Sequence, residues 1–186
     1  MKDDWSVERL ADRLQISEVL YRYCGAIDRI QPDALMDRVF HADALIDKTG
    51  APYPVAEFVA NVAARHPGVP NASHMVTNVL IDFVDDDTAF VESWCIALER
   101  HPPVGSESRT VDRVYRVRYG DRFERRGQSE SGGQWRIALR TFVIDHILST
   151  VADFALDPPA AGRIAGRRDA DDAIVRLRVS LGLPQA

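Results

Sequence analysis

Four long segments in which apolar and polar residues alternate make up most of the chain after residue 72. They are SHMVTNVLIDFV (73–84), TAFVESWCIALER (88–100), RTVDRVYRVRYGDRFERR (109–126) and QWRIALRTFVIDHIL (134–148). Turn-forming stretches, DDD, HPPVGSES and GQSESGG, separate them. Because alternation with a period of two is typical of strands, this part of the chain predicts a meander of long antiparallel strands, several of them long enough to curve.

A helical pattern precedes the strands. From Ser6 to about Arg29, apolar residues recur at steps of three and four, which predicts an amphipathic helix. Ser6 suits the N-cap of this helix, and Trp5 and Leu10 stand at the two positions of a hydrophobic staple. The predicted apolar stripe comprises Val7, Leu10, Ala11, Leu14, Val19, Leu20, Tyr23, Cys24 and Ile27.

Two further helices are expected before the long strands begin. One runs from Gln31 to Phe40 with Pro32 near its first turn, and the other runs from Pro54 to Arg65. A short strand is expected between them, at Ala44–Asp47. Helices followed by an antiparallel meander are typical of the α+β class, in which the helices pack on one face of the sheet.

The composition fits one globular domain with a sizeable core. Of the 186 residues, 46% are hydrophobic and 27% are charged. We place this domain at residues 1–156. Beyond it the composition shifts to Pro, Ala, Gly and Arg, and residues 157–186 are interpreted as a C-terminal extension with a short helix in GRRDADDAIVRLRVSLGL.

Charge and hydropathy argue against two classes of partner. The net charge is −5 with acidic and basic residues interleaved, so no basic face for nucleic acid is expected. No apolar run reaches the ~20 residues of a membrane-spanning helix, and the N-terminal MKDDWS lacks the apolar region of a signal peptide. Cys24 and Cys95 are expected to be buried, reduced thiols. The expectation is a cytoplasmic protein with a small-molecule substrate.

No pattern in the chain calls for a cofactor or a metal ion. The five histidines are dispersed without HxH or HExxH spacing, and neither a glycine-rich phosphate loop nor a GxSxG elbow occurs. Lysine occurs only as Lys2 and Lys48. Schiff-base chemistry is therefore expected only if Lys48, in the polar stretch IDKTG, is buried.

An acid and a phenol stand where the apolar stripe of the first helix ends. Tyr23 and Asp28 reach the edge of the core there, and an unpaired carboxylate is costly to desolvate, so Asp28 needs a partner. In the first long strand, His74 and Asn78 point to one side and Met75 to the other. If the first helix closes the His74 side, Asp28 can hold one imidazole nitrogen and leave the other as an acid or base near neutral pH. A structural histidine is the alternative.

Three stretches carry a resemblance to a known family. EVLYRYCGAIDRIQPDALMDRVFHADALID, SHMVTNVLID and GDRFERRGQSESGGQWRIALRTFVID, in this order, resemble the SnoaL-like branch of the nuclear-transport-factor-2-like superfamily, in the group that contains scytalone dehydratase, hexachlorocyclohexane dehydrochlorinase and bile-acid 7α-dehydratase. The resemblance covers roughly residues 5–150. It implies a cone-shaped α+β barrel, in which N-terminal helices pack on a strongly curved, mixed but mostly antiparallel sheet and enclose a deep apolar pocket.

The resemblance also implies catalytic roles for four residues. Asp28 matches the family's acid at the end of the first helix, and His74 matches the histidine with which that acid forms a dyad. Tyr23 stands where the bile-acid dehydratase has an active-site tyrosine and the dehydrochlorinase a lysine, so its phenol could donate to a leaving hydroxyl or an oxyanion. Arg140 matches an arginine that often faces the pocket and could hold negative charge.

Other readings of these positions stay open. Arg140 is equally compatible with an exposed arginine on an edge strand, or with a salt bridge to Asp121 or Glu124. Scytalone dehydratase uses a second histidine from a later strand, a role that neither His101 nor His146 matches. Aromatic residues at strand spacing suit a core as well as a pocket. The residues expected to line the substrate pocket are Trp94, Asn78, Phe58, Tyr53, Tyr115 and Phe142.

The resulting hypothesis is a cofactor-independent lyase with an Asp–His acid/base dyad. It would remove water, halide or a small carbonyl fragment such as formaldehyde from a small, apolar, cyclic or aromatic molecule. The alternatives are a ketosteroid-type isomerase or a polyketide cyclase, which use the same proton chemistry, and a non-catalytic ligand-binding or assembly module of the same fold. A homodimer or homotrimer is expected, because Met75, Val79 and Ile81 would form an exposed apolar face on the sheet.

Overall fold

The computed structural model describes residues 4–102, 109–127, 133–152 and 162–184. Its helices are α1 (Val7–Asp28), α2 (Pro32–Arg38), α3 (Val55–Arg65) and α4 (Ala173–Ser180), and a 3₁₀ turn follows α3 at His66–Gly68. Its strands are β1 (Phe40–Asp47), β2 (Tyr53–Pro54), β3 (Asn71–Phe83), β4 (Thr88–His101), β5 (Thr110–Arg126) and β6 (Gln134–Ala152). The boundary expected after residue 156 and parts of two expected turns lie outside the described residues.

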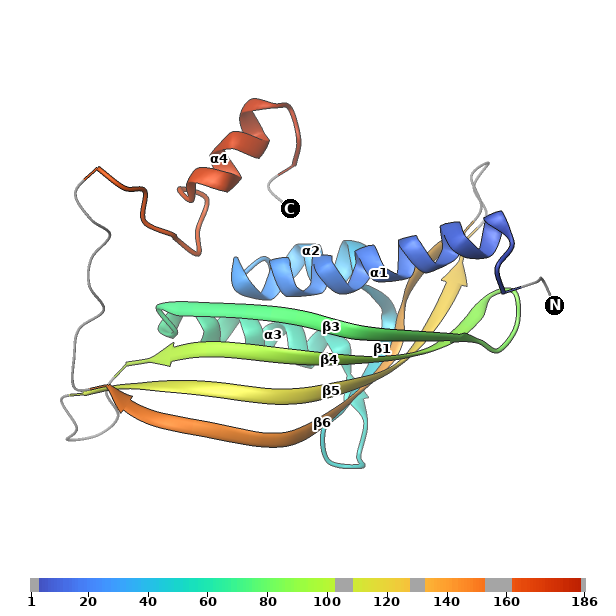
Figure 1. The fold of residues 1–186 in the computed structure, drawn as a ribbon, viewed down its shortest axis with the longest axis horizontal. Coiled ribbons are helices and arrows are strands. Elements are labelled where there is room, and N and C mark those ends of the chain that lie inside the picture. The colour runs from blue at the N-terminus through green and yellow to red at the C-terminus, as the bar shows by residue number, and fades with distance from the viewer. Residues whose placement is uncertain (1–3, 103–108, 128–132, 153–161, 185–186) are drawn as a thin grey trace.

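The strands form one mixed sheet in the order β2-β1-β6-β5-β4-β3 (Figure 1). β1 pairs with β6 in parallel, and every other pair is antiparallel. The α+β class and the mixed, mostly antiparallel sheet are therefore confirmed. The sheet is not closed, because β2 and β3 are its two edges. Strand β6 lies inside the sheet between β1 and β5, so the alternative in which Arg140 is exposed on an edge strand is wrong.

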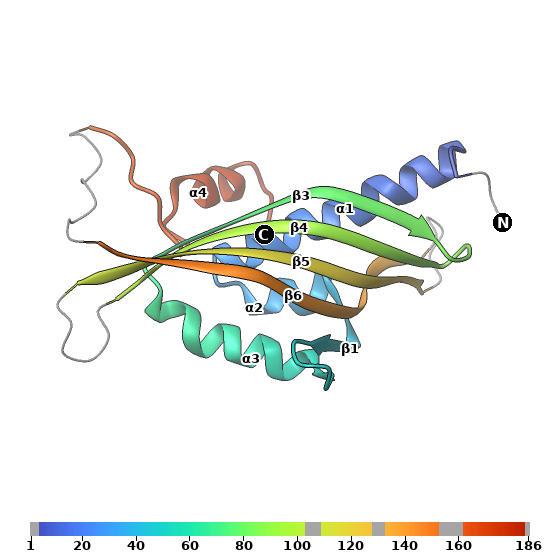
Figure 2. The same cartoon turned by 60° about the horizontal axis from the view of Figure 1, so that its bottom comes forward.

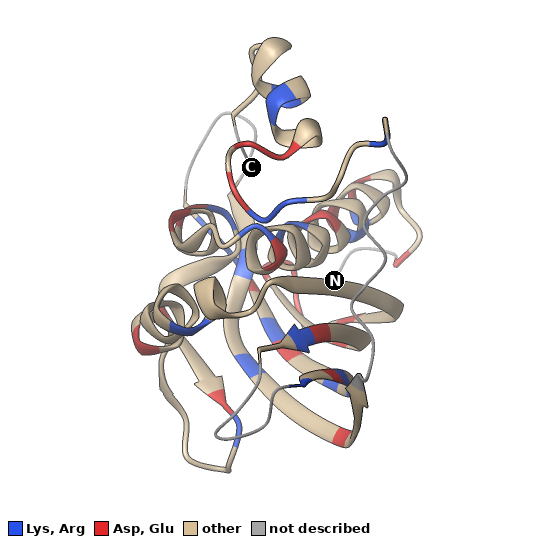
Figure 3. Ribbon diagram, turned by 90° about the vertical axis from the view of Figure 1, so that its left-hand side faces the viewer, with Lys and Arg blue, Asp and Glu red and all other residues tan. Residues whose placement is uncertain are grey.

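Helices α1, α2 and α3 lie on the same side of the sheet (Figure 2). Viewed along the long axis of the molecule, the sheet curls toward these helices and gives the cone-like shape of the fold (Figure 3). Within the described residues, no helix has both the length and the apolar character to cross a membrane. The core lies between sheet and helices and includes Ile16, Leu20, Ile27, Leu35, Phe40, Ile46, Val55, Phe123 and Ile137.

The start of α1 follows its predicted cap but not its predicted stripe. The Ser6 hydroxyl accepts a hydrogen bond from the Arg9 backbone N–H at 3.2 Å, which confirms the N-cap. Val7, Leu10 and Leu14, however, are exposed, and Trp5 is exposed too. The predicted apolar stripe is therefore wrong for the first half of the helix and holds only from its middle to its end.

Charged residues take the place of the stripe in the first turns of α1. Arg9 is fully buried and donates hydrogen bonds to the Asp85 carbonyl and to Asp86, both at 2.9 Å. Asp12 accepts hydrogen bonds from the Trp135 indole at 2.8 Å and from Arg125 at 3.0 Å. Because every one of these charged groups has partners, the helix can be anchored by a polar network where sequence periodicity predicts apolar contact.

A β-bulge in β3 exchanges the two faces of the strand. The register with β4 shifts between Thr77 and Leu80, and Asn78 adopts a positive φ of 49° there. One extra residue reverses the alternation, so Ile81 turns into the core while Leu80 is exposed. Val79 also packs against the core. The prediction that Val79 and Ile81 face outward is therefore wrong.

The outer face of the sheet is apolar through other residues. Met75, Ile96, Leu98 and Leu148 are all exposed on neighbouring strands. Trp94 lies on this face as well, with the Arg118 guanidinium 5.5 Å from the centre of its indole ring.

The C-terminal extension returns over the helices rather than the sheet. The short helix expected in residues 166–183 is present as α4, which lies on the side of α1 that faces away from the strands (Figure 1). Asp172 caps α4 by accepting a hydrogen bond from the Ile174 backbone N–H at 3.0 Å. Val175 is the buried apolar anchor of this helix, whereas Leu177 and Val179 are exposed.

Candidate active site

The last residue of α1 meets the fourth residue of β3. Asp28 Oδ1 lies 2.7 Å from His74 Nδ1, and Asp28 Oδ2 accepts a hydrogen bond from the His74 backbone N–H at 2.9 Å. The side chain of His74 is 9% exposed and that of Asp28 is 21% exposed. With Nδ1 donating to the carboxylate, Nε2 is the imidazole nitrogen left for a substrate.

The environment of His74 favours a proton on the ring. Burial lowers the pKa of His74, but the hydrogen bond that His74 donates to Asp28 and the negative charge of Asp28 raise it by more, so the net shift is upward from 6.5. Because Asp28 stabilises the charged ring, the imidazole can accept a proton and return it.

An arginine of the C-terminal extension holds the end of α1 in place. Arg168 Nε donates to the Asp28 carbonyl at 2.7 Å, and its Nη2 donates to the Ile27 carbonyl at 3.0 Å. Its Nη1 donates to the carbonyl groups of His66 and Val69. Ile27 and Asp28 end α1, where a cation is favoured by the helix dipole. Arg168 therefore connects the end of α1, which carries Asp28, to the segment that precedes β3, which carries His74. The sequence did not indicate this role.

His74 lines a pocket of about 140 Å³ between the helices and the concave face of the sheet. Its walls come from α1, α3, β4, β5 and β6. Three of the residues expected from the sequence line it, namely Phe58, Tyr115 and Phe142, and Tyr23 lines it as well. The other lining residues are Ile27, Lys48, Val62, Arg65, His66, Ala97, Glu99, Val117, Tyr119 and Ile144.

The remaining expected pocket residues lie elsewhere. Tyr53 lines a neighbouring hollow that shares Lys48 and Phe58 with the pocket. Trp94 points from the opposite face of β4, and Asn78 is exposed at the bulge of β3, so neither lines the pocket. The reason is the parity of the strands, because Cys95 and Ala97 are the residues of β4 that face the helices.

Tyr23 is a buried phenol in the pocket wall. Burial raises the pKa of Tyr23 well above 10, with Arg140 opposing the shift, so the hydroxyl is a neutral donor at physiological pH. Its ring packs edge-on against Phe40 and Tyr119, with centroid separations of 6.1 Å and 5.8 Å.

Arg140 lies behind this wall and not in it. It is fully buried, and its guanidinium stands 4.1 Å from the Tyr23 ring centre and 4.2 Å from that of Tyr119. Nε and Nη2 donate to the two oxygens of Asp121 at 2.8 Å and 2.7 Å. The salt bridge to Asp121 that the sequence left open is therefore present. Arg140 does not face the pocket, because it is absent from the lining.

Lys48 and Arg65 are the basic residues in the lining of the pocket. The Lys48 ammonium lies 5.0 Å from the ring centre of Phe58 and 4.8 Å from that of Phe142. Burial lowers the pKa of Lys48 from 10.5. The sequence indicated Lys48 only as a candidate for Schiff-base chemistry. Its position directly after β1, in a chain with two lysines, was the signal that could have placed it in the pocket.

A second histidine lines the pocket, and it is neither His101 nor His146. His66 is buried in the turn after α3, and burial followed by the charge of Arg65 lowers its pKa to about 4. His101 instead pairs with Glu99 at 2.8 Å, and His146 is exposed on the outer face. His66 was missed because the proline and glycine around it indicate only a helix end.

Among the residues that the structure describes, no three His, Cys, Asp or Glu side chains gather as ligands for a metal ion. Cys24 and Cys95 are free and buried, as expected. What the site offers is a base, a neutral phenol and a cation around an apolar cavity. This set suits proton transfer at carbon with stabilisation of developing negative charge.

Comparison with solved structures identifies the same fold elsewhere. LinA aligns with a TM-score of 0.66 and 21% identity over 82% of this chain and 98% of LinA. The hexachlorocyclohexane dehydrochlorinase LinA-type3 from Novosphingobium barchaimii LL02 aligns with a TM-score of 0.65 and 20% identity over 82% and 99% of the two chains. A scytalone dehydratase-like protein from Novosphingobium aromaticivorans DSM 12444 aligns with a TM-score of 0.63 and 18% identity over 83% of this chain and 97% of that protein. These similarities concern the fold.

The curated proteins contain no sequence that matches this chain. The model of the SnoaL-like domain matches residues 8–141, a span that runs from the first turn of α1 into β6 and includes Tyr23, Asp28, His74 and Arg140. The chain therefore belongs to the SnoaL-like domain family.

Proposed function

We propose that the protein is a cofactor-independent lyase that eliminates a small leaving group from an apolar cyclic or aromatic molecule. The observation that carries the proposal is the 2.7 Å contact between Asp28 and His74 Nδ1, with the histidine in the wall of an apolar pocket. Dehydrochlorinases and dehydratase-like proteins share the fold, which supports the same class of reaction here.

In the proposed reaction His74 Nε2 takes a proton from a C–H bond of the substrate. The electron pair of that bond forms a carbon–carbon double bond, and the leaving group departs with the electrons of its own bond. A leaving hydroxyl receives the proton from the His74 imidazolium and departs as water, whereas a halide departs as the anion and the imidazolium returns its proton to solvent. Asp28 holds the ring and stabilises its charged form.

Two pocket groups are assigned to the negative charge that develops. The Tyr23 hydroxyl is the neutral donor for an oxyanion or a leaving oxygen, and the Lys48 ammonium in the lining attracts an anionic leaving group. Arg140 touches no substrate in this proposal. It acts as a positioning residue, because its guanidinium holds the Tyr23 ring from behind at 4.1 Å.

The size and walls of the pocket support a compact apolar substrate. Its volume of about 140 Å³ is close to that of the apolar cavities that bind benzene, about 150 Å³, so one ring with small substituents is the expected substrate core. Phe58, Tyr115 and Phe142 provide aromatic walls for such a ring.

Two other functions use the same site and differ in what they produce. A ketosteroid-type isomerase or a polyketide cyclase would move a proton at carbon without releasing a fragment. A binding module would hold the molecule unchanged. The Asp28–His74 pair supports catalysis over binding, because it places an acid/base group in the wall of the pocket.

The test is a screen of hydroxylated and halogenated one-ring compounds with product analysis by mass spectrometry and measurement of released halide. Wild type, His74→Ala and His146→Ala form the matched set, since His146 is exposed on the outer face of β6. We expect His74→Ala to lower kcat by ~10²–10⁴ and His146→Ala to leave it unchanged. Full activity in His74→Ala would show that the base is elsewhere, and isomerised or unchanged compounds would select one of the other two functions.

Self-association is part of the proposal. The exposed outer-face residues Met75, Ile96, Leu98 and Leu148 form the apolar surface that a second copy would cover. Light scattering after gel filtration should give the mass of a dimer or trimer for the wild type, and a lower mass for Leu98→Lys. A monomeric wild type at micromolar concentration would refute it.

A further inference from the structure

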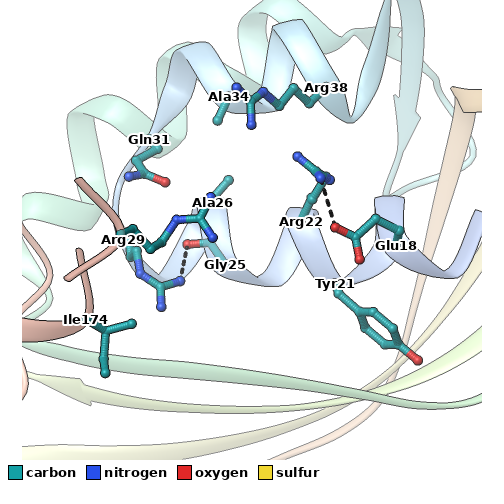
Figure 4. Close-up of a pocket in the computed structure, with 11 residues that line it drawn as sticks. Glu18, Tyr21, Arg22, Gly25, Ala26, Arg29, Gln31, Ala34, Arg38 and Ile174 are labelled. Atoms are coloured by element: carbon teal, nitrogen blue, oxygen red, sulfur yellow. Dashed lines mark hydrogen bonds and ion pairs between the residues drawn. The ribbon is translucent and has the colours of Figure 1, made fainter. Parts of the chain in front are cut away.

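A second pocket lies on the opposite side of α1 from the candidate active site. It has a volume of about 310 Å³ and is bounded by α1, α2 and α4 (Figure 4). Tyr23 and Ile27 of α1 face the first pocket, whereas Arg22, Gly25 and Ala26 of the same helix face the second. The two pockets share no lining residue, so the Asp28–His74 dyad does not explain the second pocket.

Arginine dominates the lining of the second pocket. Arg22 comes from α1, Arg29 directly follows α1, Arg38 comes from α2 and Arg178 from α4, and Glu18 is the one acidic residue in the lining. Basic groups outnumber acidic groups four to one in this lining, although the net charge of the chain is −5. A concave surface with an excess of positive groups attracts anionic ligands.

Three of the four lining guanidinium groups, those of Arg22, Arg29 and Arg178, keep donors for a ligand. Arg22 pairs with Glu18 at 2.9 Å through Nη2, and Arg29 Nη1 makes only a long contact of 3.4 Å with its own helix carbonyl at Gly25. Arg178 uses Nε at 3.2 Å for the Pro184 carbonyl. A guanidinium has five N–H groups, so each of these contacts among described residues leaves most of the fork available. Figure 4 shows Arg22 and Arg38 extending into the space between α1 and α2.

Gly25 makes room for this arrangement. A Cβ at position 25 would come within 3.1 Å of Arg29 Nη1, so the glycine lets the Arg29 side chain fold back against the helix and frame the cavity. The same glycine, together with Ala26, Ala34 and Ile174, gives the pocket small apolar walls. A ligand that fits both features has an anionic group and an apolar body.

We propose that the pocket between α1, α2 and α4 binds a small organic anion. A carboxylate, sulfonate or phosphate group would be held by the guanidinium groups of Arg22, Arg29 and Arg178, in the bidentate geometry that arginine favours. The apolar part of the ligand would lie on Gly25, Ala26, Ala34 and Ile174. This site is independent of the proposed lyase activity and of its substrate.

Isothermal titration calorimetry with naphthalene-2-sulfonate as the probe tests the proposal, with the neutral naphthalene-2-sulfonamide as the matched ligand. We expect the sulfonate to bind to the full chain at low ionic strength, at least about tenfold more tightly than the sulfonamide, and to weaken as salt is added. Equal affinity for the two compounds, or no measurable binding of the sulfonate, would overturn the proposal.

Protein variants locate the binding. Arg178→Gln and Arg176→Gln are neighbours on α4, but only Arg178 lines the pocket, whereas Arg176 pairs with Asp171 on the surface. We expect Arg178→Gln and Arg22→Gln each to weaken the sulfonate by about tenfold or more, and Arg176→Gln to have no effect. Ala97→Leu, which fills the first pocket, should also have no effect. Loss of binding in Ala97→Leu with normal binding in Arg22→Gln and Arg178→Gln would place the probe in the first pocket and refute the site.

Discussion

His74 donates to both oxygens of the Asp28 carboxylate, through its backbone N–H at 2.9 Å and its imidazole at 2.7 Å. Asp28 is the last residue of α1, where the negative end of the helix dipole disfavours an anion. The two hydrogen bonds from β3 and the guanidinium of Arg168 on the neighbouring carbonyls compensate for this. The dyad is thus also the joint between the first helix and the sheet.

The first prediction concerns the pH dependence of stability. The pKa of His74 is raised in the folded protein, so the stabilisation from its pair with Asp28 is complete below the unfolded value of about 6.5 and is lost as pH rises through the folded pKa. Asp28→Asn should therefore destabilise the protein most at pH below 6.5, by about 1.5–3 kcal/mol, and less at higher pH. Denaturant unfolding at pH 5.5 and 8.5 measures the difference, and a penalty that grows with pH would contradict the assignment.

The second prediction separates the two tyrosines at the end of α1. Tyr23→Phe removes the donor in the pocket wall and should lower kcat by ~10²-fold without unfolding the protein, because the ring contacts remain. Tyr21→Phe is the control, since Tyr21 is exposed on the other side of the helix. The assay is turnover of the compound identified in the screen. Equal activities of the two variants would remove Tyr23 from the mechanism.

The third prediction concerns Arg168 and its neighbour. Arg168→Ala removes the donors that hold Ile27, Asp28, His66 and Val69, and should cost about 1.5–3 kcal/mol of stability and lower kcat. Arg167→Ala should leave the stability essentially unchanged, because Arg167 is exposed and pairs with Asp169 at the surface. Arg168→Lys should recover only part of the loss, since a single ammonium cannot span four carbonyl groups. Matching melts for the two alanine variants would refute the role of Arg168.

The fourth prediction tests the buried ion pair behind the pocket wall. Arg140→Met leaves the Asp121 carboxylate buried without its partner and should cost about 3–5 kcal/mol. Asp121→Leu should cost a similar amount. The double variant should be more stable than the sum of the single losses predicts, because no unpaired charge remains. Chemical denaturation of the four proteins completes the cycle, and strict additivity would mean that the pair is not coupled.

Most of the fold follows from periodicity and turn chemistry. The long strands, the helix from 54 to 65 and the N-cap at Ser6 are local patterns, and all are present. The bulge at Asn78 is not local in this sense. Nothing in SHMVTNVLIDFV marks an extra residue, so alternation assigns Val79 and Ile81 to the wrong face.

The candidate site divides in the same way. Asp28 and His74 could be paired in advance because a carboxylate at the end of a helix needs a partner and the family resemblance supplies one. Arg168 and His66 could not, because their roles depend on where the extension and the turn after α3 come to lie. Arg140 shows the limit most clearly, since Asp121 was only one of the partners that the sequence left open, and its burial behind Tyr23 depends on the curvature of the sheet.

The most direct test of the central claim is a ¹⁵N NMR titration of the His74 ring in the wild type and in Asp28→Asn. We expect Nδ1 to carry the proton of the neutral His74 ring and the pKa of His74 to lie above 6.5 in the wild type. We expect this pKa to fall in Asp28→Asn. A His74 pKa at or below 6.5 in the wild type, or one that the substitution leaves unchanged, would contradict it.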